Sequence, residues 1–129
     1  MVERWGNDES MSSQYSTCVY KDGFLYGTHG REDFANGVMR CVDAKTGEVA
    51  WQQSTGVAHT ILAGDKMIML TSDGTLLLAQ ANPKEFKQLS EVQISTNSTR
   101  AIPALSNGRF FLRDNRGQSG KLAAYQVGQ

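Results

Sequence analysis

The feature that most constrains this chain is an internal repeat. Three apolar segments each run into a two-residue turn, at Asp22-Gly23, Gly64-Asp65 and Asn107-Gly108, and a second apolar segment follows each turn. Turn dipeptides of this kind are strong β-hairpin signals, because Gly, Asn and Asp tolerate the positive φ that tight hairpin turns need. The repeat therefore predicts tandem units of about forty residues, each opening with a hairpin.

Each unit continues with two further apolar segments. The first of these resumes at a glycine in every copy, namely Gly37, Gly74 and Gly120. The last begins at Glu48 in the first copy and at Leu89 in the second copy. Four short apolar segments separated by turns predict a four-stranded antiparallel sheet, the unit that forms one blade of a β-propeller.

The third copy ends before its fourth segment, and a matching segment lies at the start of the chain. Residues 2–5 read VERW, which matches EVAW at 48–51. The fold class predicted is all-β, with about three four-stranded antiparallel blades in one segment, 1–129. Its parts are an outer strand in 1–7, a first blade in 15–56, a second in 57–98 and a third in 99–129 without its own outer strand.

Three blades form an arc, which leaves a strand edge to be covered. Two explanations stay open. Either two chains close a ring with two-fold symmetry, each lending VERW to the other's last blade, or the sequence is the C-terminal segment of a longer propeller. The chain is then either a partial propeller or half of an oligomeric ring. In both cases we expect a protein partner or self-association to complete the propeller.

Charge and apolar content exclude several classes of partner. Thirteen Lys and Arg balance thirteen Asp and Glu, so no overall field favours nucleic acid, and we expect no nucleic-acid partner. No stretch approaches the eighteen apolar residues of a membrane helix, and MVERWGNDES lacks the apolar core of a signal peptide. Cys18 and Cys41 form no CxxC pair and are expected to be free thiols.

The segment DAKTGEVAW at 43–51, together with the preceding GFLYG, resembles the repeat of the quinoprotein-like propellers, the PQQ-like repeat. That family includes quinoprotein dehydrogenases and assembly lipoproteins of the BamB type, and the resemblance implies a periplasmic or exported protein. Three residues are given structural roles. Asp43 binds backbone N–H groups of a turn, Gly47 takes positive φ, and Trp51 packs between blades. In the second copy, Ile94 stands where a tryptophan is expected.

Polar residues gather on the loops that leave one face of a propeller, beside its central channel. The predicted ligand-binding residues on these loops are His29, Arg31, Asp33, His59, Arg100, Arg113, Asp114 and Asn115. The arginines suit an anionic or polar ligand, since guanidinium groups bind carboxylate and phosphate oxygens. The competing interpretation is that these loops are polar because they are exposed. His29, Asp33 and His59 lack a close-spaced metal-ligand pattern, and no metal is predicted.

No catalytic motif is present, so the predicted function is a non-enzymatic propeller scaffold for protein or small-ligand binding, without a cofactor. One alternative is a fragment of a PQQ-dependent dehydrogenase. The resemblance implies that such an enzyme holds quinone and Ca²⁺ through acidic and amide oxygens, and Asp114 and Asn115 are the neighbouring pair of that kind. A second alternative is a structural remnant with no ligand.

Overall fold

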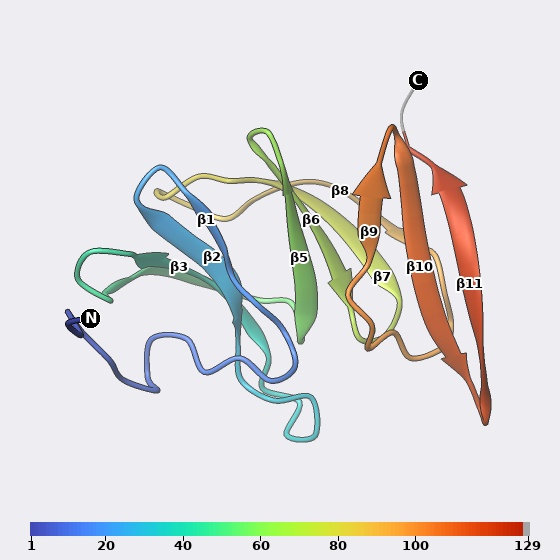
Figure 1. Cartoon of the computed structure of the whole chain (residues 1–129), viewed down its shortest axis with the longest axis horizontal. Helices are drawn as coiled ribbons and strands as arrows, with labels where there is room; N and C mark the ends of the chain where they lie inside the picture. The colour runs from blue at the N-terminus through green and yellow to red at the C-terminus, as the bar shows by residue number, and fades with distance from the viewer. Residues whose placement is uncertain (128–129) are drawn as a thin grey trace.

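The structure is a computed structural model that describes residues 1–127. Three antiparallel sheets stand side by side, in chain order (Figure 1). The first sheet contains β1 (Val19–Lys21), β2 (Phe24–His29), β3 (Val38–Asp43) and β4 (Val49–Ser54). The second contains β5 (Ala58–Ala63), β6 (Lys66–Thr71), β7 (Thr75–Gln80) and β8 (Lys87–Gln93). The third contains β9 (Ala104–Ser106), β10 (Arg109–Arg116) and β11 (Ser119–Gln126).

This arrangement confirms the predicted all-β class and the tandem sheets. Gly128 and Gln129, which belong to the predicted third unit, lie outside the described residues. The hairpin turns form where the sequence indicated: φ is 48° at Asp22 and 88° at Gly23, and 48° at Asn107 and 69° at Gly108. Two consecutive residues with positive φ give the turn whose twist matches that of the flanking strands.

The outer strands of the first two sheets pair in the same register. A β-bulge follows Cys41 in the first sheet and Leu78 in the second. Trp51 lies opposite Cys41, and Ser90 lies opposite Leu78. Ser90 therefore occupies the place of Trp51 in the second sheet, and the prediction of Ile94 at that place was wrong. The pairing with the neighbouring strand fixes this register, and the spacing of apolar residues does not show it.

Apolar side chains fill the spaces between neighbouring sheets. Met67 and Met69 are fully buried in the cluster between the first and second sheets. Ile68 and Leu70 point to the opposite face of β6 and pack in the cluster that includes Phe110 of the third sheet. Because successive side chains of a strand alternate between faces, a sheet covered on both sides has a continuous apolar strand such as MIML, residues 67–70, at its centre.

The third sheet has one covered face and one open face. Phe110 and Leu112 point toward the second sheet and are fully buried. Phe111 lies on the other face and is half-buried, and Leu122 on that face is 73% exposed. Because the strand order is β11-β10-β9, β11 pairs with no further strand within residues 1–127 and forms an edge of the sheet. In the part of the chain that the structure describes, the third sheet thus presents an outward face with Phe111 and Leu122 near its centre and an open strand edge at β11.

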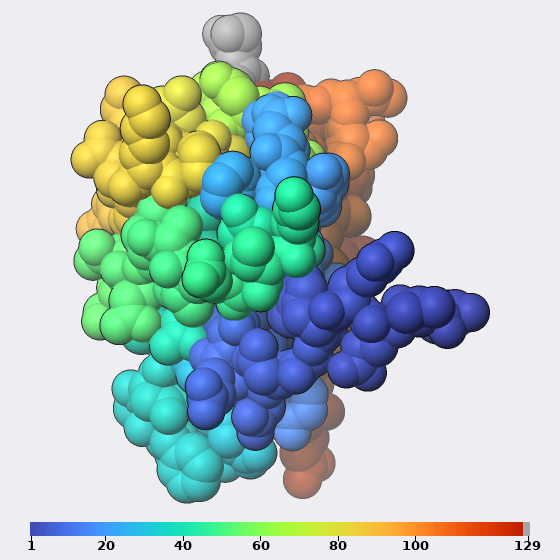
Figure 2. Space-filling view, turned by 90° about the vertical axis from the view of Figure 1, so that its left-hand side faces the viewer, coloured from blue at the N-terminus to red at the C-terminus, as the bar shows by residue number. Residues whose placement is uncertain are grey.

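The N-terminal segment does not form the predicted outer strand, since residues 1–7 pair with no strand in the described chain. It lies instead across the face of the first sheet that points away from the second sheet, and it is dark blue in Figure 2. Nε1 of Trp5 donates to the carbonyl of Ala44 at 3.0 Å. The sulfur of Met11 fills the space beside Gly27. The first sheet is therefore covered on both faces, unlike the third.

Candidate functional site

The predicted ligand-binding residues fall into two groups in the structure. One group, around the first two sheets, contains His29, Arg31, Asp33, His59 and Arg100. The other group lies on β10 and contains Arg113, Asp114 and Asn115. Within residues 1–127, no hydrogen bond or ion pair joins one group to the other. The two groups are therefore described separately.

A polar chain connects the three sheets in the first group. Nε of Arg100, on the connection from β8 to β9, lies 3.2 Å from Oε2 of Glu32, on the β2–β3 loop. The carbonyl oxygen of Arg100 lies 2.8 Å from Nε2 of His59, which is on β5 and 8% exposed. His59 and Arg100 thus tie neighbouring segments together, a role that positions the loops.

Arg31 and Asp33 form an exposed pair on the β2–β3 loop. Nη2 of Arg31 lies 2.8 Å from Oδ2 of Asp33, and its guanidinium lies over the ring of Phe34 at 5.2 Å. The hydrogen bond from Arg31 lowers the pKa of Asp33 below its ordinary value. Exposed ion pairs of this kind contribute little to stability, so the pair mainly orders the loop.

His29 holds the N-terminal segment against the first sheet. Its Nδ1 accepts a hydrogen bond from the backbone N–H of Ser12 at 3.0 Å. Burial, and then the positive charge of Arg40, lower the pKa of His29 below its ordinary value. A lowered pKa favours the neutral ring, which is the form that can accept this hydrogen bond.

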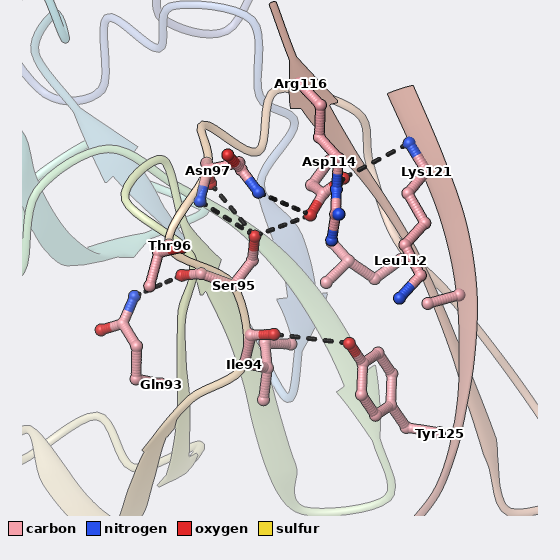
Figure 3. A pocket seen from close by; sticks show the side chains of 11 residues that line it. Gln93, Ile94, Ser95, Thr96, Asn97, Leu112, Asp114, Arg116, Lys121 and Tyr125 are labelled. Atoms are coloured by element: carbon pink, nitrogen blue, oxygen red, sulfur yellow. Dashed lines mark hydrogen bonds and ion pairs between the residues drawn. The ribbon is translucent and has the colours of Figure 1, made fainter. Parts of the chain in front are cut away.

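Asp114 is the centre of the second group and is 4% exposed (Figure 3). Its Oδ2 accepts from Oγ of Ser95 at 2.8 Å and from Nδ2 of Asn97 at 3.3 Å. Its Oδ1 accepts from Nε of Arg116 and from the backbone N–H of Lys121, both at 3.3 Å. The hydrogen bond from Ser95, followed by Arg116 and Asn97, lowers the pKa of Asp114. The carboxylate joins β10 to the β8–β9 connection.

A cleft of about 250 Å³ opens beside this carboxylate, between the end of β8 and β11. Its lining includes the basic residues Arg116 and Lys121. Tyr125 adds an aromatic ring, and its hydroxyl donates to the carbonyl of Ile94 at 3.4 Å. The cleft is open on one side, and its basic and aromatic lining suits a small anionic or polar ligand.

The neighbouring residues Asp114 and Asn115 do not fit a shared cation. They are successive residues of β10, so their side chains point to opposite faces of the sheet. Oδ1 of Asn115 accepts from Nη1 of Arg113 at 2.8 Å, on the face away from Asp114. The pair therefore does not supply the acidic and amide oxygen ligands that quinone-bound Ca²⁺ requires. Among the described residues, no three His, Cys, Asp or Glu side chains are grouped to hold a metal ion, and His29, Asp33 and His59 are not brought together.

The three residues with predicted structural roles lie at one turn and one interface. Oδ1 of Asp43 accepts from the backbone N–H of Lys45 at 2.7 Å, and φ of Gly47 is 79°. Trp51 packs against Tyr26 of its own sheet and Phe86 of the next, with ring centroids 6.1 and 5.6 Å from its own. Cys18 and Cys41 are free thiols.

Sequence reasoning missed the hydrogen-bond and ion-pair partners of the predicted ligand-binding residues. Glu32 and Gln14 connect the first group, and Ser95 is the strongest hydrogen-bond partner of Asp114. Each lies on a loop of the kind expected to carry polar residues. No local pattern pairs Ser95 with Asp114, because the contact joins the end of one sheet to the middle of the next.

We expect Asp114→Asn to reduce stability most near neutral pH. The folded pKa of Asp114 is lowered, so the carboxylate stabilises the fold above its unfolded pKa of about 4, and this contribution is lost as pH falls through the folded pKa. The difference in melting temperature between wild type and variant should be largest at pH 7 and shrink toward pH 3. Asp65→Asn is the control, because Asp65 forms an exposed pair with Lys66 and should give a small difference. A pH-independent difference for Asp114→Asn would contradict this assignment.

Comparisons with known proteins place the fold. No family model matches the chain, and no curated protein matches its sequence. Solved structures do match. A europium-containing methanol dehydrogenase has 14% identity and a TM-score of 0.64, covering 85% of this chain and 22% of the enzyme. A quinohemoprotein alcohol dehydrogenase from Pseudomonas putida HK5 has 18% identity and a TM-score of 0.65, covering 87% and 19%.

BamB from Moraxella catarrhalis also matches, with 14% identity and a TM-score of 0.54, covering 71% of this chain and 26% of BamB. The chain thus spans about a fifth of the length of the dehydrogenases it matches. These neighbours are PQQ-like β-propeller proteins, so the predicted resemblance is confirmed for the fold: the chain has the architecture of a set of their blades. No helix able to cross a membrane occurs in residues 1–127.

Proposed function

We propose that this chain is a non-enzymatic β-propeller scaffold that binds protein through the open face of its third sheet. The observation that carries the proposal is the exposure of Leu122. Counted from the hairpin turn, Leu122 holds the position in the third sheet that Met39 holds in the first. Met39 is 0% exposed beneath the second sheet, whereas Leu122 is 73% exposed.

The neighbouring pair at the centre of that face follows the same equivalence. Phe111 pairs with Ala124 in the third sheet as Tyr26 pairs with Cys41 in the first. Tyr26 and Cys41 are fully buried against the second sheet. The centre of the open face therefore carries the residue types of a sheet-to-sheet interface, with Arg109 and Arg113 beside it. Exposed apolar residues grouped in this way mark binding surfaces.

The polar residues support a scaffold more than an active site. Asp114 accepts hydrogen bonds from two neighbouring segments, and His59 and Arg100 connect sheets to one another. Quinone-dependent dehydrogenase chemistry is the rival, favoured by the fold of the neighbours. We do not extend it to this chain, because Asp114 and Asn115 point to opposite faces of β10.

Photo-cross-linking tests the binding surface. The variant Leu122→p-benzoylphenylalanine places a cross-linker on the open face, and Leu89→p-benzoylphenylalanine places it on β8, where Leu89 is 44% exposed. After irradiation of cells producing each variant, we expect a protein adduct at position 122 and little at 89, with the partner identified by mass spectrometry. No adduct at 122, or equal adducts at both positions, would remove the proposed function.

A further inference from the structure

Trp5 contacts the first sheet in the way that Trp51 contacts the second. Nε1 of Trp5 donates to the carbonyl of Ala44 at 3.0 Å, at the turn between β3 and β4. Nε1 of Trp51 donates to the carbonyl of Asn82 at 2.7 Å, on the connection between β7 and β8. The ring of Trp5 also covers Gly47, where an added Cβ would lie 2.8 Å from Cε3. Both indoles are thus docked on the connection that leads to an outer strand.

This equivalence assigns VERW a place in the fold. Trp51 belongs to the outer strand of the sheet that precedes its docking site. By the same relation, Trp5 belongs to the outer strand of a sheet that precedes the first sheet. Among residues 1–127, the sheet with three strands is the third, which lies at the far end of the molecule from the N-terminus (Figure 1). Val2 is 78% exposed and available for pairing.

We infer that two copies of this chain exchange residues 2–6, each adding an outer strand to β11 of the other and so joining the two copies into a ring. The inference rests on the proposed function and names a second copy as the protein that the open face binds. The partner strand satisfies backbone groups along the free edge of β11 that would otherwise be a site of uncontrolled pairing.

The register of the exchange follows from the first sheet. Trp51 lies opposite Cys41, and the position equivalent to Cys41 in the third sheet is Ala124. Trp5 therefore lies opposite Ala124 of the partner subunit, and Gly6 lies opposite Ala123 of the partner subunit. The indole of Trp5 then packs between Phe111 of the partner subunit and its own Gly47, as Trp51 packs between Tyr26 and Phe86.

Disulfide trapping between two different variants tests the exchange. Gly6→Cys in one chain and Ala123→Cys in the other are co-expressed, both with Cys18→Ser. Directly opposed Cα atoms of an antiparallel pair lie about 4.5 to 5.5 Å from each other, within the range of a disulfide. Cys41 can stay, because it is 0% exposed and burial raises its pKa to about 11, which suppresses its reactivity.

We expect a disulfide-linked species of twice the 14.2 kDa chain mass, formed between the two variants. Light scattering should also give a doubled mass for the wild type, a monomer for Leu122→Lys, and a dimer for the control Leu89→Lys. The register control, Gly6→Cys with Ala124→Cys, places the second thiol on the other face and should link poorly.

A monomer at all concentrations, or linking no better than in the register control, would overturn the exchange. The photo-cross-linking at position 122 separates that failure from failure of the proposed function. An adduct with a different protein keeps the binding face and discards the second copy. The absence of any adduct discards both.

Discussion

The variant Gly74→Ala should lose about 4 kcal/mol of unfolding free energy, the largest loss expected from a single methyl group in this chain. Gly74 has φ of +85°, which disfavours a side chain, and an added Cβ would lie 2.8 Å from the carbonyl carbon of Ser95 and closer still to its oxygen. Those atoms are backbone, and the Gly74 carbonyl itself accepts hydrogen bonds from the N–H groups of Ile94 and Ser95. The connection from the second to the third sheet has no room to move without breaking these bonds.

Gly117→Ala is the matched control for Gly74→Ala. Gly117 has φ of +59°, but an added Cβ there meets no atom within 4 Å. Its loss should therefore reflect backbone conformation alone, about 1 kcal/mol. Urea denaturation followed by circular dichroism measures both variants. Equal losses would show that the contact with Ser95 is not a constraint.

The second large effect is expected from Trp51→Ala, with a loss of about 3 kcal/mol. The ring of Trp51 contacts Tyr26 and Phe86, and its Nε1 bonds to the Asn82 carbonyl across the first interface. Removing it opens a gap between two sheets and leaves that carbonyl without its donor. Urea denaturation measures the loss, and a loss below that of an average surface substitution would contradict the packing role.

Two further substitutions, one at each docked tryptophan, complement Trp51→Ala. Trp51→Phe keeps an aromatic ring and removes the donor, so it should lose about 1 kcal/mol, the usual net value of one hydrogen bond. Trp5→Ala removes the other docked indole from a terminal segment that forms no strand, and in the monomer it should lose less than Trp51→Ala.

Local signals in the sequence were sufficient to predict the sheets. Each hairpin turn is specified by adjacent residues, such as Asp22 and Gly23, whose conformational preference does not depend on distant contacts. The outer strand of the second sheet was harder to align. Its exposed residues carry little apolar periodicity, so only pairing with β7 shows that Ser90 is equivalent to Trp51.

The candidate site was predicted less well, for a physical reason. Loops carry polar residues whether they bind a ligand or one another, and the partners of Asp114 and His59 come from other parts of the chain. One correction was available from sequence alone. Asp114 and Asn115 follow the apolar residues of a strand, and the alternation of side chains along it already places them on opposite faces.

One end face of the molecule is covered and the other is exposed, so the two ends are not equivalent. The N-terminal segment lies over the first sheet (Figure 2), whereas on the outer face of the third sheet Leu122 is exposed. Two different but complementary surfaces form heterologous, head-to-tail contacts. Such contacts either close into a ring or extend into an open filament. In the two-copy ring, the angle between successive sheets is what lets the contacts close, and a change of that angle at the sheet interfaces would turn the closed ring into an open filament.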